Sequence, residues 1–175
     1  MSALKERDRH LLFVSVSDKS VVGYLRRGAH VEQKLGKSID AIILAVSSDR
    51  YRLAAQFLNS AAKIVKTSPP QYRTVVSRSY YAMYHAARAV VFIETGGDDY
   101  QDHSKLSQYV PENFPAVAIW RNKLREARLL RNRCDYDPYP KQQKVFALEC
   151  QALLVDTRDF LRLCKQYLIG RGCEL

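Results

Sequence analysis

Four polar side chains fall on one face of the helix that the sequence predicts over residues 72–95. Their spacing of three, four and three residues brings them to one side of an α-helix, and they are Arg78, Tyr81, His85 and Arg88. Two cations, a phenol and an imidazole together suit phosphate binding and proton transfer. The alternative is an ordinary exposed polar face, and the residues alone leave both interpretations open.

An arginine interrupts the apolar face of the helix predicted over residues 116–134. Arg131 stands in a stripe whose other members are Trp120, Leu124, Ala127 and Cys134. Burying a guanidinium costs several kcal/mol unless the group is paired with an opposite charge or points into a functional site. Asp135 lies one turn further on, with Tyr136 beside it. The pattern supports either a buried Arg–Asp clamp or an arginine that points into a site.

A separate, solvent-type stripe on the same predicted helix consists of Arg121, Arg125, Arg128 and Asn132. The chain has 28 basic and 18 acidic residues, which gives a formal net charge of +10. Residues 49–95 hold 7 basic and 2 acidic side chains, and residues 120–145 hold 8 and 3. This balance indicates a polyanionic partner, with nucleic acid the first candidate. The basic residues of the helices predicted over residues 72–95 and 116–134 would then form a phosphate-facing groove between these helices. The alternative is that they form ordinary solvated helix faces.

Glycine and proline divide the chain into four long helical patterns. The predicted helices cover about residues 49–66, 72–95, 116–134 and 141–169, and each has an apolar stripe at helical spacing. They predict an all-α, up-and-down antiparallel four-helix bundle over residues 49–169, followed by a tail of residues 170–175. The second and third helices carry the polar groups described above.

Residues 1–48 form a predicted N-terminal extension of mixed structure. The apolar residues 11–16 suit a short strand, and Asp18 suits the cap of a helix through Val21 and Leu25. Residues 39–46 extend the helix that follows. We expect this extension to pack on the bundle or on a partner chain.

Composition excludes several other classes of protein. No apolar run reaches the roughly 18–20 residues of a membrane span, and no secretory signal is visible, so we expect a cytoplasmic protein that does not bind a membrane. The four cysteines lack metal-binding spacing and are expected to be reduced thiols. We therefore expect neither a metal nor a cofactor.

Two motifs together resemble the signature of HEPN-domain proteins. The first is Arg78-Ser79-Tyr80-Tyr81-Ala82-Met83-Tyr84-His85-Ala86-Ala87-Arg88-Ala89, and the second is Arg131-Asn132-Arg133-Cys134-Asp135-Tyr136-Asp137. Between them, His103-Ser104 lies where this branch often has a histidine after a glycine-containing loop. The likeness is to small stand-alone HEPN proteins with an R-x-x-x-D-Y ending, and it spans about residues 49–168.

The resemblance implies a bundle that is usually dimeric and, in many members, a metal-independent ribonuclease. Such members are often toxins paired with a nucleotidyltransferase or another antitoxin, or parts of defence systems. Their site is an arginine followed after four residues by a histidine. Here the arginine is Arg131, but the histidine position holds Tyr136. The tyrosine that a partner enzyme can adenylylate would fall at Pro138, with Tyr139 next to it.

Three functional hypotheses follow from these residues. The first is a nucleic-acid-directed toxin or defence protein that cleaves RNA, in which Arg131 stabilises charge beside Asp135 and Tyr136. A phenol, with an ordinary pKa of about 10, is a poor general base, so His85 or His103 would transfer the proton. The second is a non-catalytic HEPN protein that binds nucleic acid or a nucleotide, or is the helical partner of a nucleotidyltransferase. The third is a buried network around Arg131 that holds a homodimer together.

Overall fold

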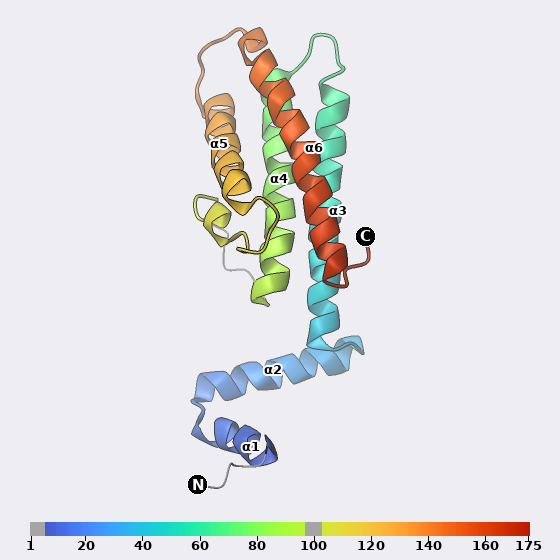
Figure 1. Cartoon of the computed structure of the whole chain (residues 1–175), viewed down its shortest axis with the longest axis vertical. Coiled ribbons are helices and arrows are strands. Elements are labelled where there is room, and N and C mark those ends of the chain that lie inside the picture. The colour runs from blue at the N-terminus through green and yellow to red at the C-terminus, as the bar shows by residue number, and fades with distance from the viewer. Residues whose placement is uncertain (1–5, 97–102) are drawn as a thin grey trace. The chain divides into compact units, whose positions relative to one another are not determined.

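The computed structural model describes residues 6–96 and 103–175, and every regular element in these ranges is helical (Figure 1). The prediction of an all-α fold is confirmed. In chain order the elements are α1 (Glu6–Val16), α2 (Lys19–Leu35), α3 (Ile39–Ile64), α4 (Tyr72–Thr95), η1 (Leu106–Tyr109), α5 (Val117–Tyr136), η2 (Gln143–Phe146) and α6 (Ala147–Gly170).

The chain divides into two compact units, residues 1–42 and 43–175. In the first unit, the predicted strand over residues 11–16 is wrong, because these residues form the second half of α1. No strand is present within the described residues to pair with such a segment. The predicted cap is confirmed, since the Asp18 carboxylate accepts from the backbone N–H groups of Ser20 and Val21 at 2.7 and 3.0 Å.

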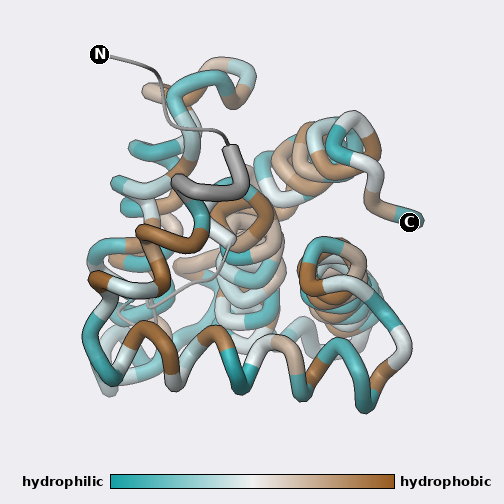
Figure 2. The backbone as a smooth tube through the Cα atoms, turned by 90° about the horizontal axis from the view of Figure 1, so that it is seen from below, coloured by the Kyte–Doolittle hydropathy of each residue, from teal (hydrophilic) through white to brown (hydrophobic). Residues whose placement is uncertain are grey.

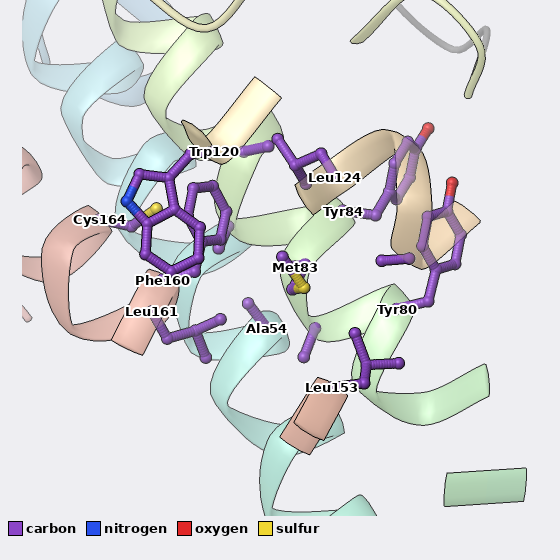
Figure 3. Close-up of a cluster of buried hydrophobic side chains, with 14 of the residues drawn as sticks. Ala54, Tyr80, Met83, Tyr84, Trp120, Leu124, Leu153, Phe160, Leu161 and Cys164 are labelled. Carbon is purple, nitrogen blue, oxygen red and sulfur yellow. The ribbon is translucent and has the colours of Figure 1, made fainter. Parts of the chain in front are cut away.

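The second unit is an antiparallel bundle in which α3, α4, α5 and α6 run alternately up and down (Figure 1). Helix α4 is the central element and packs on both α5 and α6. Its apolar stripe is buried as predicted, and Met83 belongs to the same core cluster as Phe160 of α6 and Trp120 of α5 (Figure 3). Burial of this kind contributes about 1.5–3 kcal/mol for each large apolar side chain.

Two helix boundaries differ from the prediction in ways that affect the polar residues. Helix α5 continues to Tyr136, so Asp135 and Tyr136 belong to its last turn. The last helix begins at Ala147 rather than near residue 141, because residues 143–146 form a short 3₁₀ helix. The extension of α3 back to Ile39 is as expected from the apolar residues 39–46.

The four cysteines are buried and form no disulfide. Burial raises the pKa of the Cys134 and Cys150 thiols to about 11. At neutral pH these two groups are therefore thiols, which pack as small apolar side chains. Within the residues described, no helix is both long enough and apolar enough to span a bilayer.

Candidate functional site

Arg131 lies where the end of α5 packs on α4, and its guanidinium is held from several sides. Nη2 donates to the Tyr81 hydroxyl at 2.8 Å, and Nη1 donates to the Tyr136 hydroxyl at 3.0 Å and to Asn132 Oδ1 at 3.1 Å. Nε lies 2.7 Å from Asp135 Oδ2. We call these five residues the Arg131 centre.

The groups around the Arg131 guanidinium keep it positively charged. The ion pair with Asp135 is close, although the Nε–H bond is not directed at the carboxylate as in a hydrogen bond. Burial alone would lower the pKa of Arg131, but the hydrogen bond with Tyr136 and the nearby Tyr81 and Asp135 raise it above its ordinary value. The guanidinium therefore stays protonated at every physiological pH.

The Arg131 centre is closed on one side and open on the other. The Arg131 side chain is only 15 % exposed and that of Asp135 is 25 % exposed, whereas Tyr136 is 68 % exposed. The predicted Arg–Asp clamp is thus present, and one side of it reaches solvent at Tyr136.

A second cluster adjoins the Arg131 centre through Tyr80. The Tyr80 ring lies 6.0 Å from Arg131 Cζ, and its hydroxyl lies 2.6 Å from Nδ1 of His103. The His103 ring stacks on Tyr84 with centroids 4.0 Å apart and planes 5° apart. Burial raises the pKa of Tyr80, so its hydroxyl keeps its proton. Figure 3 shows the Tyr80 and Tyr84 hydroxyls turned away from the core.

His85 occupies a different environment from His103. Its ring stacks on Phe57 of α3 at 5.3 Å and meets Tyr84 edge-on at 5.2 Å. Burial, together with the charges of Arg88 and Arg50, lowers the pKa of His85 to about 4. At neutral pH its imidazole therefore carries no charge and cannot act as a general acid.

The predicted polar face of α4 lies largely against aromatic rings. Arg78 lies over the Phe57 ring at 5.4 Å, and Arg88 lies over the Tyr84 ring at 5.6 Å. Cation–π contacts of this kind contribute about 0.5–1 kcal/mol at exposed sites. Neither arginine is among the groups that contact Arg131.

The basic stripe of α5 is divided between different roles. Arg121 is tied to the preceding loop, since it donates to the Val110 carbonyl at 2.5 Å and pairs with Glu112 at 2.7 Å. Arg125 donates to Asn122. The positive charge of Arg128 opposes the rise that burial causes in the pKa of Tyr80.

Tyr139 is one of the candidates that lie beyond the end of α5. It is 68 % exposed, with the Lys141 ammonium 5.9 Å from its ring. Its ring is therefore open to solvent, outside the Arg131 centre.

An open polar hollow of about 740 Å³ lies between η1 and α5. Among the residues that the structure describes, its polar lining consists of Ser104, Ser107, Gln108, Arg121, Asn122 and Arg125, none of which is acidic. Ser107 and Arg125 also line the small pocket that contains His103. The hollow therefore adjoins His103, and Tyr80 connects His103 to the Arg131 centre.

Arg73 is a structural residue of the site that the sequence did not reveal. From the first turns of α4 it donates to the carbonyls of Cys134, Asp137 and Pro140 at 2.6, 2.7 and 2.8 Å. These bonds satisfy carbonyls at the end of α5, which would otherwise lack helical partners. Arg73 thereby fixes the turn that carries Asp135 and Tyr136.

The fold and both motifs define a small helical protein of the HEPN type. The family model of the HEPN domain matches residues 47–167, well over half of the chain, so the chain belongs to this family. HEPN domains generally act on nucleic acids. No curated protein matches the chain. The match contains every residue of the Arg131 centre and leaves α1 and α2 outside it.

Proposed function

We propose that this HEPN protein cleaves RNA without a metal ion, using Arg131 and His103. One observation carries the proposal: Tyr80 joins the two residues, with its ring beside the guanidinium and its hydroxyl on the imidazole. A permanent cation and a titratable group are thus combined although position 136 holds a tyrosine. These are the two groups that RNA transesterification most needs.

Cleavage begins when the ribose 2′-oxygen attacks the adjacent phosphorus and the 5′-oxygen leaves. The products are a 2′,3′-cyclic phosphate and a new 5′-hydroxyl. Arg131 stabilises the charge that develops on the phosphoryl oxygens. The phosphate reaches it from the Tyr136 side, where the solvent-exposed hydroxyl is the easiest partner to displace.

Two proton transfers complete the reaction. Asp135, beside the guanidinium, is the carboxylate that accepts the proton of the 2′-hydroxyl. His103, protonated on both ring nitrogens, gives its Nε2 proton to the leaving 5′-oxygen, while its Nδ1–H donates to the Tyr80 hydroxyl. The low pKa of His85, about 4, makes His85 unsuitable for this second step.

The polar hollow between η1 and α5 suits the strand that continues from the scissile phosphate. Arg125 and the serines that line it are donors for phosphate oxygens. The exposed imidazole of His103, already stacked on Tyr84, adds an aromatic surface for a base. The Arg131 centre would then bind one phosphate and the hollow the next along the strand.

The direct test is incubation of the protein with a labelled oligoribonucleotide in EDTA. We expect cleavage with a cyclic phosphate end, which a 2′-deoxy substitution at the cleaved nucleotide abolishes. Arg131→Lys and His103→Ala should each reduce the rate at least 100-fold. Arg133→Lys is the matched control, since Arg133 pairs with Glu149 away from the centre. Absence of cleavage, or equal rates in Arg131→Lys and Arg133→Lys, would refute the proposal.

A second candidate function is RNA binding without cleavage. It is favoured by the ion pair between Arg131 and Asp135 and by Tyr136 in the histidine position. In that case the protein binds the oligoribonucleotide with an affinity that falls steeply with salt, and both RNA ends stay intact. Filter binding and gel analysis of the same samples distinguish the two functions.

The biological setting that suits either function is a toxin or defence system. A nucleotidyltransferase or another antitoxin would then be the partner, and the exposed Tyr139 is the residue available to it for adenylylation. Mass spectrometry after co-expression with a nucleotidyltransferase encoded beside this chain tests the idea. An unmodified Tyr139 and no stable complex would argue against that partner.

A further inference from the structure

Within the part of the chain that the structure describes, helix α2 leaves a long apolar face uncovered. None of its residues is buried, and Tyr24, Leu35 and Leu25 are 67, 58 and 48 % exposed. Figure 2 shows apolar and polar residues alternating along this helix. Exposed apolar surface costs about 25 cal/mol for each Å², and contiguous patches mark interaction sites.

The apolar face has the spacing of a coiled-coil seam. Val21, Tyr24, Gly28, Val31 and Leu35 follow one another at three, four, three and four residues. A Cβ atom at Gly28 would meet no other part of the chain within 4 Å, and a hollow of about 770 Å³ opens around this glycine. Large side chains above and below a small one form a surface into which another helix can pack.

The charges beside the seam identify the partner. Four cations lie on α2, and Glu32 is its single acid. Glu32 borders the apolar hollow, and Arg27 flanks the other side of the seam. In a parallel, in-register pair of identical helices, residues five apart across the seam face each other, so Arg27 meets Glu32 of the partner subunit. An antiparallel pair would instead bring Arg27 and Lys34 of both copies together.

We propose that α2 binds the α2 helix of a second copy of this chain as a short parallel two-stranded coiled coil. The Glu32 carboxylate also accepts the backbone N–H of Ile39 at 2.8 Å, which ties it to the start of α3. A carboxylate accepts several hydrogen bonds, so this bond and the pairing with Arg27 are compatible.

Glu32 also argues against the main competing partner. A basic amphipathic helix can lie on an anionic membrane with its apolar face among the lipid chains. That orientation would place the Glu32 carboxylate in the apolar layer, where an unpaired charge is strongly unfavourable. A second copy supplies the opposite charge instead.

Single cysteines in the full chain test the register directly. Val21→Cys alone and Leu35→Cys alone should each give disulfide-linked dimers under mild oxidation, and Arg26→Cys, on the opposite face, should not. The native cysteines are buried, which keeps the background low. Linkage only in the Val21→Cys/Leu35→Cys double variant would show an antiparallel pair and overturn the proposal. Linkage no better than with Arg26→Cys would also overturn it.

A charge swap tests the ion pair by analytical ultracentrifugation. Arg27→Glu should weaken dimerisation at least tenfold, and adding Glu32→Lys should restore most of it. Arg26→Glu makes the same change in net charge on the opposite face and should have little effect. Equal effects of Arg27→Glu and Arg26→Glu, or sedimentation of the chain with phosphatidylserine vesicles combined with a monomer in solution, would contradict the proposal.

Discussion

Tyr81 and Tyr136 both accept a hydrogen bond from Arg131, but their burial differs, which leads to a quantitative prediction. The Tyr81 hydroxyl bonds Nη2 at 2.8 Å in a partly buried position, and the Tyr136 hydroxyl bonds Nη1 at 3.0 Å on the exposed side. Replacing either tyrosine by phenylalanine removes one oxygen and keeps the ring. The two substitutions therefore make the same chemical change in different surroundings.

The expected costs follow from how easily water replaces the lost hydroxyl. A hydrogen bond to a charged group contributes about 1.5–3 kcal/mol when the donor is left without a partner. We expect Tyr81→Phe to lower the free energy of unfolding by about 2 kcal/mol, which is a fall in Tm of about 5 °C for a domain of this size. Tyr136→Phe should cost less than about 0.5 kcal/mol, because water reaches Nη1.

Urea unfolding, followed by circular dichroism, measures both costs. A double-mutant cycle with Arg131→Met then shows whether the cost belongs to this hydrogen bond, because Tyr81→Phe should cost less than about 0.5 kcal/mol once the guanidinium is absent. The reasoning is refuted if Tyr81→Phe costs no more than Tyr136→Phe. It is also refuted if the cost of Tyr81→Phe is unchanged in the Arg131→Met background.

Three further perturbations follow from the structure. Because the pKa of His85 falls from its ordinary 6.5 to about 4 on folding, the free energy of unfolding should be highest above pH 6.5. It should then fall by about 2 kcal/mol as the pH drops to 4, after allowance for partial exposure, and His85→Gln should flatten this urea-unfolding pH profile. Arg73→Met should lower the free energy of unfolding by about 2–3 kcal/mol and speed amide hydrogen exchange at the end of α5, because three carbonyls lose their donor. Arg78→Met, which loses mainly a cation–π contact, should lower the free energy of unfolding by less than about 1 kcal/mol. Arg125→Ala should weaken RNA binding and reduce the slope of log affinity against log salt by about one, and Lys165→Ala on α6 should change neither.

Local spacing was sufficient to predict the contacts made within a single helix. The pairing of Arg131 with Asp135 follows from four residues of separation, since such side chains are neighbours on a helix. The buried stripe of α4 follows from its periodicity in the same way. A six-residue apolar run such as 11–16, by contrast, is too short for its period to distinguish strand from helix, which is why that prediction was wrong.

The periodicity of the sequence did not predict contacts between distant segments of the chain. Tyr80 lies on the buried face of α4, but its hydroxyl reaches a histidine 23 residues further on. Arg73 bonds carbonyls more than 60 residues away. Periodicity shows which side of a helix faces the core, but it does not show which loop or helix end meets that side.

Arg131 can be both the partner of Asp135 in an ion pair and a residue that binds a ligand. The sequence offered these two roles as alternatives, but one arrangement allows both. Asp135 offsets the cost of bringing a guanidinium to 15 % exposure and holds its Nε edge. The Nη1 edge is directed at Tyr136, the most exposed member of the centre. An anion arriving from solvent can therefore replace a hydroxyl without breaking the ion pair, because it approaches the opposite edge of the same group. The residue that stabilises the end of α5 is thus also positioned to bind a phosphate, and Asp135 keeps it oriented while it does so.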